Sequence, residues 1–334
     1  MRLLRRCAVP CVPRRWQEKL PANRAQCSGF VWSVCSKKSP CINARKSDRY
    51  QSITQCTPTF NCNSVSCRQK DNRWTPNREG GSIVYRIVRK PQIVAHRGYS
   101  GVYPENTLCA IRGAITIGVD MVELDVRLSR DHVPVIFHSA SLLSITACPR
   151  RVEELTAAEL KTLDAGAWRG AAYCGERIPT LDEVLVLTRG KIPVNLDIKT
   201  PAAIEAVVAL VQKHSMLDEV VLSGCTWADA RRVRRLEPSL HVLLNVDGYL
   251  RTLLRILNTR LAFHLSRLQA YAAQPMGLNV SHHYGAERFI RDAAIHSLPV
   301  WTWTVDEPHR ALQLARVGAS SITSNWPDRI MAAL

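Results

Sequence analysis

From residue 91 onward, short apolar segments alternate with amphipathic helical segments, and this regular order restricts the chain to the α/β class of folds. The predicted strands span residues 93–96, 121–128, 134–138, 193–199, 219–224, 241–246, 277–282, 299–305 and 320–325. The predicted helices lie between them and at the end, at residues 106–118, 180–190, 201–215, 226–238, 250–273, 285–297, 307–318 and 326–334. If 134–138 continues the second strand, eight strand–helix pairs result, which predicts a TIM (β/α)8 barrel of the usual size, roughly 250 residues.

An open, doubly wound sheet is the alternative arrangement for such a pattern. The first predicted strand is not followed by the GxGxxG or GxxxxGK[ST] patterns that bind nucleotide phosphates in open sheets. Polar residues instead follow the C-terminal ends of several strands, where the active sites of barrel enzymes are built. The sequence therefore favours the closed barrel.

One segment interrupts the alternation of strands and helices. Residues 139–179 are too long for an ordinary loop between a strand and a helix. Residues 151–166 within it are helical in character, and Thr156 and Glu159 have the spacing of a capping box. We interpret the segment as a small insertion after the second strand that lies over the barrel mouth.

The first 90 residues differ from the rest of the chain in charge. They contain 19 Lys and Arg against 4 Asp and Glu, and so carry +15 of the formal net charge of +17. Any contact with nucleic acid or an anionic membrane would involve this basic segment. We expect no specific nucleic-acid partner. The sequence predicts a basic, Cys-rich, poorly ordered extension over residues 1–90 and a single domain over residues 91–334.

Eight of the twelve cysteines lie before residue 68, and none of them forms a CxxC pair, which argues against a zinc ribbon. The Arg-rich start is typical of an organelle transit peptide but lacks the apolar run of a secretory signal. A disulfide-bonded module and an upstream extension of the reading frame are the other interpretations. No run approaches the 18 apolar residues of a membrane span. We expect a cytoplasmic protein, with organelle targeting as the alternative and peripheral membrane contact allowed.

Acidic residues gather on the inward faces of two predicted strands. Side chains alternate along a strand, so Glu123 and Asp125 share a face and lie about 7 Å apart along it. Asp197 and Lys199 share a face of the strand at 193–199 in the same way. Three carboxylates in one partly desolvated site repel one another unless a cation is present, and their all-oxygen donor set favours Mg²⁺ or Ca²⁺.

Seven short motifs resemble, in order and spacing, those of the glycerophosphodiester phosphodiesterase family. They are HRG at 96–98, PENT at 104–107, ELDV at 123–126, PVIFH at 134–138, ERIPTLDEVL at 176–185, LDIK at 196–199 and WTVDEP at 303–308. The resemblance covers residues 91–334 and none of the extension. It implies a TIM barrel with a small insertion after the second strand. It also implies hydrolysis of a small-molecule glycerophosphodiester to glycerol phosphate and an alcohol, helped by a divalent cation.

The resemblance assigns Glu123, Asp125 and Asp197 as metal ligands and His96 and His138 as the general acid and base. Each histidine ends a predicted strand beside the acidic site. Imidazole titrates near neutral pH, which suits it to protonating a leaving oxygen and deprotonating a nucleophile. The sequence does not distinguish the acid from the base.

Five further residues complete the predicted site. Arg97 and Lys199 match family positions and carry the charge that a phosphate requires. Trp303 is expected to line the glycerol part of the substrate. Glu105 is expected to orient Arg97 or the metal, while Asn106 or the residue after it caps the following helix.

Four positions depart from the usual family pattern. Asp197 stands where Glu is usual, and Ser139 follows His138 where Asp is usual. The pair at 324–325 is Ser-Asn instead of Thr-Asp, and 223–225 reads SGC where an SF-type run is common. None of these changes removes a proposed ligand or base, although His138 loses an acidic neighbour that would orient it.

Two other functions agree with the same fold. A lysophospholipase D or related phospholipid phosphodiesterase would keep this site but would need an apolar acyl groove and contact with a membrane. A non-catalytic barrel is less favoured, because both histidines and all three acids are retained.

Overall fold

The structure is a computed structural model that describes residues 74–79, 82–87, 90–246, 274–283 and 286–334. The helix predicted over 250–273 and most of the predicted N-terminal extension lie outside these residues. The last part of the extension contains β1 (Trp74–Glu79) and β2 (Ser82–Ile87), which pair antiparallel as a two-stranded sheet. The domain boundary at residue 90 and the order of the extension therefore stay predictions.

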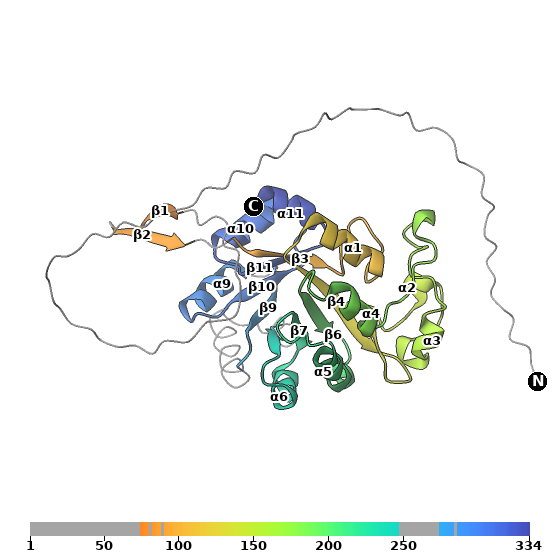
Figure 1. The fold of residues 1–334 in the computed structure, drawn as a ribbon. Coiled ribbons are helices and arrows are strands. Elements are labelled where there is room, and N and C mark those ends of the chain that lie inside the picture. The colour runs from red at the N-terminus through yellow and green to blue at the C-terminus, as the bar shows by residue number, and fades with distance from the viewer. Residues whose placement is uncertain (1–73, 80–81, 88–89, 247–273, 284–285) are drawn as a thin grey trace, which may run out of the picture. The chain divides into compact units, whose positions relative to one another are not determined.

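Within the described residues, eight parallel strands close into a barrel, which confirms the predicted TIM fold (Figure 1). Around the barrel the strands are β3 (Gln92–His96), β4 (Met121–Leu128), β6 (Val194–Ile198), β7 (Val220–Cys225), β8 (His241–Asn245), β9 (Gly277–Ser281), β10 (Val300–Trp303) and β11 (Ser321–Ser324). Pairing of β3 with both β4 and β11 closes the ring. Every strand lies within two residues of its predicted limits.

Helices cover the outside of the barrel (Figure 1). They are α1 (Leu108–Ile117), α4 (Leu181–Thr188), α5 (Ile204–Lys213), α6 (Trp227–Leu236), α9 (Ala286–Ile295), α10 (Pro308–Arg316) and α11 (Pro327–Ala333), with a short 3₁₀ turn η3 (Pro201–Ala203) before α5. Thr107, Thr180 and Thr226 cap three of them by accepting a hydrogen bond from a backbone N–H of the first turn. Their apolar faces pack against the outward side chains of the strands.

The interior of the barrel changes from apolar to polar along the strand direction. Its N-terminal end is filled by a buried cluster of Val94, Met121, Val221, Leu243 and Trp301. Two residues further along the strands, the inward positions belong to His96, Glu123 and Trp303. The apolar layer thus forms a solid floor, and the polar side chains lie above it at the C-terminal ends of the strands, where barrel enzymes have their active sites.

The insertion after the second strand packs on its own small core. β5 (Pro134–Ile136) turns back antiparallel to β4, so the expectation that residues 134–138 continue the second strand is wrong. The insertion itself comprises α2 (Leu143–Thr146), η1 (Val152–Glu154), α3 (Ala157–Leu160) and η2 (Ala171–Tyr173). The capping box of Thr156 and Glu159 forms as predicted. Residues 139–179 do not line the pocket at the barrel mouth, and the interpretation that they lie over the mouth stays a prediction. Tyr173 of the insertion donates a hydrogen bond to the Val102 carbonyl, 3.2 Å away, in the loop after β3.

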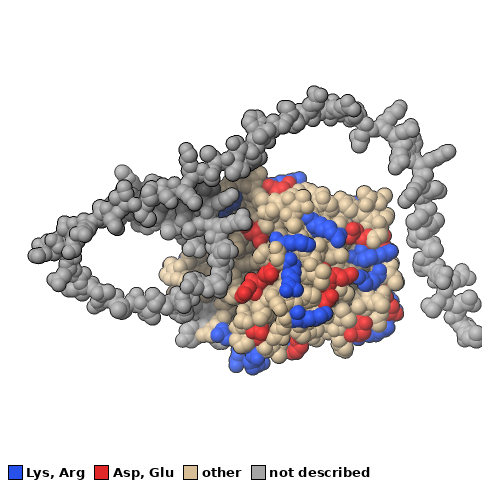
Figure 2. Space-filling model, in the orientation of Figure 1, with Lys and Arg blue, Asp and Glu red and all other residues tan. Residues whose placement is uncertain are grey.

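The charge of the surface and the length of the helices can be compared with the predictions about nucleic acid and membrane. Acidic and basic side chains are interspersed on the face shown in Figure 2, in agreement with the nearly balanced charge of residues 91–334. No helix in the described part of the chain has both the length and the apolar character needed to cross a bilayer. The expectation of a cytoplasmic protein is not tested by these observations.

We predict that removal of residues 1–73 leaves the barrel folded, because every barrel strand and every cluster of its core lies between residues 92 and 334. The thermal midpoint, followed by circular dichroism, should agree with that of the full chain to within a few degrees, which corresponds to less than about 1 kcal/mol. A midpoint lowered by more than about 10 °C, or loss of the cooperative transition, would show that the first 73 residues belong to the domain.

Candidate functional site

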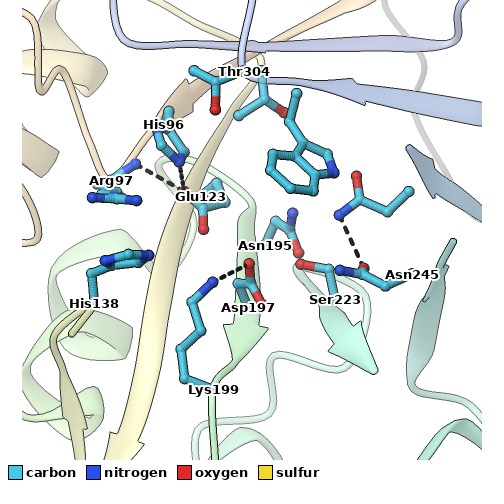
Figure 3. A pocket seen from close by; sticks show the side chains of 13 residues that line it. His96, Arg97, Glu123, His138, Asn195, Asp197, Lys199, Ser223, Asn245 and Thr304 are labelled. Carbon is cyan, nitrogen blue, oxygen red and sulfur yellow. Dashed lines mark hydrogen bonds and ion pairs between the residues drawn. The ribbon is translucent and has the colours of Figure 1, made fainter. Parts of the chain in front are cut away.

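A pocket of about 200 Å³ opens above the apolar floor of the barrel (Figure 3). All eight barrel strands contribute to its lining, through His96, Glu123, Asn195, Asp197, Ser223, Asn245, Asn279, Trp303 and Thr323. Arg97, His138, Lys199 and Thr304 complete the wall. The residues predicted to bind the phosphate and to catalyse proton transfer therefore meet in one cavity.

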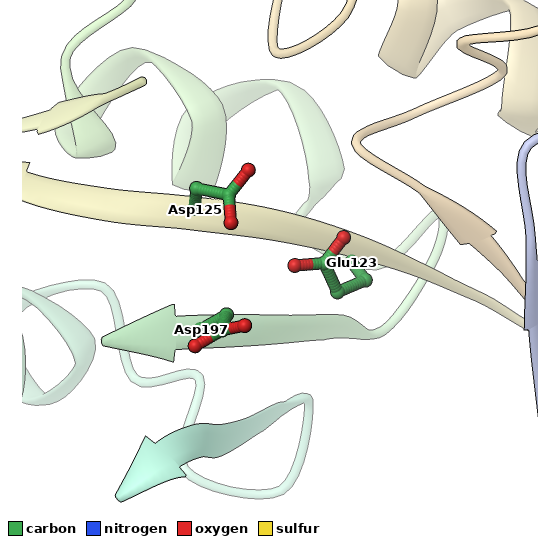
Figure 4. A group of neighbouring side chains, drawn as sticks. All are labelled: Glu123, Asp125 and Asp197. Carbon is green, nitrogen blue, oxygen red and sulfur yellow. The ribbon is translucent and has the colours of Figure 1, made fainter. Parts of the chain in front are cut away.

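Glu123, Asp125 and Asp197 form an acidic cluster, and one carboxylate oxygen from each lies within 4.8 Å of those of the other two (Figure 4). Their proximity follows from the register of β4 and β6, in which Asp125 pairs with Asp197 and Glu123 pairs with Asn195. Glu123 is only 4% exposed and Asp125 only 1%. The predicted metal ligands are thus brought together in a largely buried position.

The three carboxylates do not share one electrostatic state. Burial and repulsion by Asp125 and Asp197 raise the pKa of Glu123 well above its usual value. Burial also raises the pKa of Asp197, even though Lys199 Nζ lies 2.8 Å from its Oδ2. Burial acts on Asp125 too, but Lys199 and Arg97 outweigh it, and the pKa of Asp125 is lowered.

This charge distribution fits a divalent cation. The pKa of the buried Glu123 carboxyl is raised because desolvation and the charges of Asp125 and Asp197 outweigh the effect of Lys199. A cation would relieve that repulsion, and the donor set consists of oxygen atoms, which hard cations such as Mg²⁺ and Ca²⁺ prefer. The side chains present therefore suit the cation that the sequence predicts.

Arg97 is held on both sides by acids. Its Nη1 donates to both Glu105 oxygens, at 2.9 and 3.0 Å, and its Nε lies 3.2 Å from Asp125 Oδ2. Its backbone N–H donates to Glu123 Oε2 at 2.9 Å. Glu105 thus contacts Arg97, as expected, and the guanidinium lines the pocket where it can meet an anion.

Asn106 does not cap α1 but binds Asp125. Its Nδ2 donates to Asp125 Oδ2 at 2.8 Å, and its Oδ1 accepts from the Asp125 backbone N–H at 3.2 Å. Thr107, the other candidate, is the residue that caps α1. Asn106 therefore fixes the Asp125 carboxylate, and the hydrogen bond that its Nδ2 donates favours the ionised form.

His96 is connected to the opposite end of the chain. Its Nδ1 lies 2.7 Å from Asn325 Oδ1, and Asn325 Nδ2 donates to Asp306 Oδ2 at 2.7 Å. The other Asp306 oxygen accepts from the Asn325 backbone N–H and from Ser324 Oγ, at 2.8 and 2.9 Å. We call Asp306, Asn325 and His96 the relay.

The relay determines which nitrogen of His96 carries the proton. A carboxylate only accepts hydrogen bonds, so the Asn325 amide must turn its NH₂ to Asp306 and its oxygen to His96. That oxygen also only accepts, and the proton must therefore reside on Nδ1. Nε2 is left with a lone pair, 3.8 Å from Glu123 Oε2. Burial and the Arg97 charge lower the pKa of His96 to about 4, so the ring is neutral at pH 7.

His138 is less constrained than His96. Its Nδ1 is 3.4 Å from Ser139 Oγ, a long contact, while its backbone carbonyl accepts from Arg127 Nε at 2.8 Å. Burial, followed by the charges of Arg97 and Lys199, lowers the pKa of His138 despite the opposing effect of Asp125. The site thus combines two imidazoles, two cations for an anion and an acidic cluster for a cation, which is a set suited to acid–base chemistry at a phosphate.

Several site residues were not assigned from sequence. Asp306 and Asn325 lie in segments noted for other reasons, and nothing local reveals that they meet at His96. Ser223, Asn245 and Asn279 are the polar members of apolar strands, and this interruption of the apolar pattern is the signal that would have indicated inward polar positions.

Comparison with known proteins agrees with this site. A model of the glycerophosphoryl diester phosphodiesterase family matches residues 96–329. YhdW of Bacillus subtilis is 30% identical over 243 residues, 72% of this chain and 96% of that protein. A glycerophosphodiester phosphodiesterase of Caldanaerobacter subterraneus is 28% identical and covers 72% of this chain and 97% of its own. A phosphodiesterase of Oleispira antarctica, solved with its product sn-glycerol-3-phosphate, superposes with a TM-score of 0.65 at 29% identity over 73% of this chain and 96% of its own.

We predict that Asp306→Asn allows His96 to adopt both neutral tautomers. An amide at position 306 can donate as well as accept, so the Asn325 side chain is free to rotate and the proton should distribute over both ring nitrogens. Nitrogen-15 NMR of the imidazole should show one Nδ1–H form in the wild type and a mixture in the variant. The exposed Asp218, changed to Asn, serves as the matched control. A single Nδ1–H form in the Asp306→Asn protein would refute the orienting role of Asp306.

Proposed function

The chain belongs to the glycerophosphoryl diester phosphodiesterase family and is a phosphoric diester hydrolase, and we propose that it cleaves glycerophosphodiesters to glycerol phosphate and an alcohol. The observation that carries the proposal is the meeting of His96, His138, Arg97 and Lys199 with the acidic cluster in one pocket. Such a combination serves the charge and the proton transfers of phosphodiester hydrolysis. The cytoplasm is the proposed location.

In this proposal Arg97 and Lys199 bind the phosphate. Both line the pocket, and acidic neighbours fix both, Arg97 through Glu105 and Lys199 through Asp125 and Asp197, with Nζ 3.0 Å from Asp125 Oδ1. The ion pairs raise the pKa of each, so both carry their charge throughout the physiological range. A phosphodiester anion thereby finds two positioned positive groups.

We assign His96 as the general base. Its Nε2 lone pair is the acceptor that the relay leaves available, and the ring is neutral at pH 7. It would take the proton from the attacking hydroxyl group, whether that of water or of the neighbouring glycerol carbon. The Asn325 oxygen keeps the ring oriented while Nε2 becomes protonated.

We assign His138 as the general acid that protonates the leaving alcohol. Burial, together with the charges of Arg97 and Lys199, lowers its pKa in the free protein. A bound phosphodiester would offset those charges and raise the pKa of His138, which favours the protonated form that an acid needs. Substrate binding and proton supply are coupled in this way.

Glu123, Asp125 and Asp197 would hold a divalent cation, Mg²⁺ or Ca²⁺. When bound, the cation would stabilise the negative charge of the phosphoryl group. The chain's own contribution is to keep Asp125 ionised through Asn106, Arg97 and Lys199, so that at least one strong ligand is present before the cation arrives.

Cation binding should release protons and strengthen as the pH rises. The raised pKa values of Glu123 and Asp197 mean that a cation competes with protons, and the competition weakens once the pH exceeds those values. Calorimetric titration of Mg²⁺ or Ca²⁺ in two buffers of different ionisation enthalpy measures the released protons. Asp197→Asn should weaken binding at least about tenfold, since even outer contacts of metal sites contribute that much. Binding that is equally tight in Asp197→Asn and in the control Asp218→Asn would refute the ligand assignment.

The histidines are tested by their effect on turnover. His96→Ala and His138→Ala should each lower kcat for glycerophosphocholine by about 10² to 10⁴, and the double variant should lie little below the worse single one. A 4-nitrophenyl leaving group needs no acid, so it should restore the rate of His138→Ala far more than that of His96→Ala. His241→Ala, at an exposed position on β8, is the control. Wild-type turnover by both folded variants would remove the pair from the mechanism.

A further inference from the structure

One loop at the barrel mouth carries several residues of the proposed site. Residues 97–107 connect β3 to α1, and we call them the β3–α1 loop. The loop begins with Arg97, which is assigned to the phosphate, and it contains Glu105, which binds the Arg97 guanidinium. Near its end, Asn106 donates to the Asp125 carboxylate at 2.8 Å. The path of the loop backbone therefore sets where the guanidinium and this carboxylate lie.

The loop holds two of these residues in a backbone conformation that ordinary side chains avoid. Arg97 has a φ of 54° and Asn106 a φ of 58°, both in the left-handed region. Asparagine is enriched in this region and arginine is not, and such a conformation persists where surrounding contacts fix it. The Asn106 backbone N–H donates to the Arg97 carbonyl at 2.9 Å and so joins the two ends of the loop. The middle of the loop depends on contacts with other parts of the chain.

The insertion after the second strand supplies such contacts. Arg169 donates a hydrogen bond from Nη2 to the Gly101 carbonyl, and the Tyr173 hydroxyl donates to the Val102 carbonyl at 3.2 Å. No backbone N–H of the described residues donates to either carbonyl. The two side chains therefore pair with acceptors that the backbone leaves unpaired. The Tyr173 ring also packs edge-on against the Tyr103 ring, with centroids 6.0 Å apart.

The segment that carries Arg169 and Tyr173 is itself fixed by one carboxylate. Asp164 Oδ1 accepts hydrogen bonds from the backbone N–H groups of residues 166 and 167, both at 2.8 Å. Asp164 Oδ2 accepts from the Gly175 backbone N–H at 2.7 Å. Backbone donors before and after the two side chains thus meet at one residue, which closes the segment into a fixed turn of the insertion.

A second set of contacts joins the same loop to the residues after β11. The Gly101 backbone N–H donates to the Asn325 carbonyl at 2.8 Å, and a Cβ at Gly101 would lie 2.5 Å from that oxygen and 2.6 Å from the Trp326 ring. Ser100 Oγ donates to Asn325 Oδ1 at 2.9 Å, the same atom that His96 contacts. The loop is therefore bound both to the insertion and to the relay.

We propose that Arg169 and Tyr173 are positioning residues, which hold the β3–α1 loop so that Arg97 meets the phosphate and Asn106 meets Asp125. This proposal rests on the proposed function and gives the insertion a part in it. Neither side chain lines the pocket, so each acts through the loop. Without these contacts the loop backbone shifts and takes the guanidinium with it, and a misplacement of about 1 Å in a positioned group can lower turnover about 100-fold.

The test uses variants of the full chain that remove only the two donors. Arg169→Met keeps the length of the side chain without its donors, and Tyr173→Phe keeps the ring. Each should lower kcat for glycerophosphocholine about 3- to 10-fold, and the double variant about 10- to 100-fold. Arg169→Lys retains a charged donor and should recover most of the loss. Arg150→Met is the matched control, because Arg150 Nη2 donates at 3.1 Å to the Glu154 carbonyl, inside the insertion, and its kcat should equal that of the wild type.

Amide hydrogen exchange of the substrate-free protein measures the loop directly. In the double variant the amides of Gly101 and Asn106 should exchange at least about tenfold faster than in the wild type, while the amides of the barrel strands keep their rates. A purely structural role of the two side chains would instead speed exchange throughout the barrel and lower the thermal midpoint.

Three outcomes would overturn the proposal. The first is a folded double variant with the same kcat as Arg150→Met. The second is a lowered kcat with wild-type exchange at Gly101 and Asn106, and the third is exchange that is faster to the same extent in the loop and in the barrel strands. Failure of the proposed function has a separate signature, since a wild type that hydrolyses no phosphodiester would still show the faster loop exchange in the double variant.

Discussion

The mutual repulsion of three largely buried carboxylates is the constraint around which this barrel mouth is arranged. Asp125 is at its centre, because it receives a hydrogen bond from Asn106 and ion pairs from Arg97 and Lys199. Removing a charge from water costs several kcal/mol, and these contacts offset that cost for one of the three acids. Glu123 keeps a raised pKa instead, because burial and the neighbouring acids Asp125 and Asp197 outweigh the effect of Lys199.

The same constraint explains where apolar, charged and neutral polar side chains lie within the barrel. The apolar floor around Trp301 excludes water from below, which strengthens every charge interaction above it. Arg97 and Lys199 lie beside the acids, and the hydroxyl and amides of Ser223, Asn245 and Asn279 lie on β7, β8 and β9. His96 ends β3 and is oriented by Asn325, which follows β11. The proposed general base therefore lies where the first and last strands of the barrel pair.

The fold was predictable from sequence because each strand and helix carries its own apolar period. Alternation also places Glu123 and Asp125 on one face of their strand, whereas their proximity to Asp197 depends on the register of β4 and β6. The assignment of Asn106 was open between capping and orienting, and local pattern cannot decide it, since its partner Asp125 lies 19 residues away. The link from Asp306 through Asn325 to His96 spans 229 residues between its last two members. It depends on closure of the barrel, which brings β3 beside β11, and no sequence period encodes that contact. The insertion was recognised by its length, but its position beside the barrel depends on contacts such as that of Tyr173 with the loop after β3.

The central claim is that the charge of Asp125, rather than its shape, organises the site. The most direct measurement is phosphorus-31 NMR of glycerophosphocholine hydrolysis by the wild type and by Asp125→Asn with saturating Mg²⁺ or Ca²⁺. An asparagine has nearly the same volume but removes the negative charge that Arg97 and Lys199 face, so we expect glycerol phosphate to appear at a rate lower by 10² or more, on the order of the loss of one preorganised electrostatic contact. Formation of glycerol phosphate at the wild-type rate by a folded Asp125→Asn protein would contradict the account.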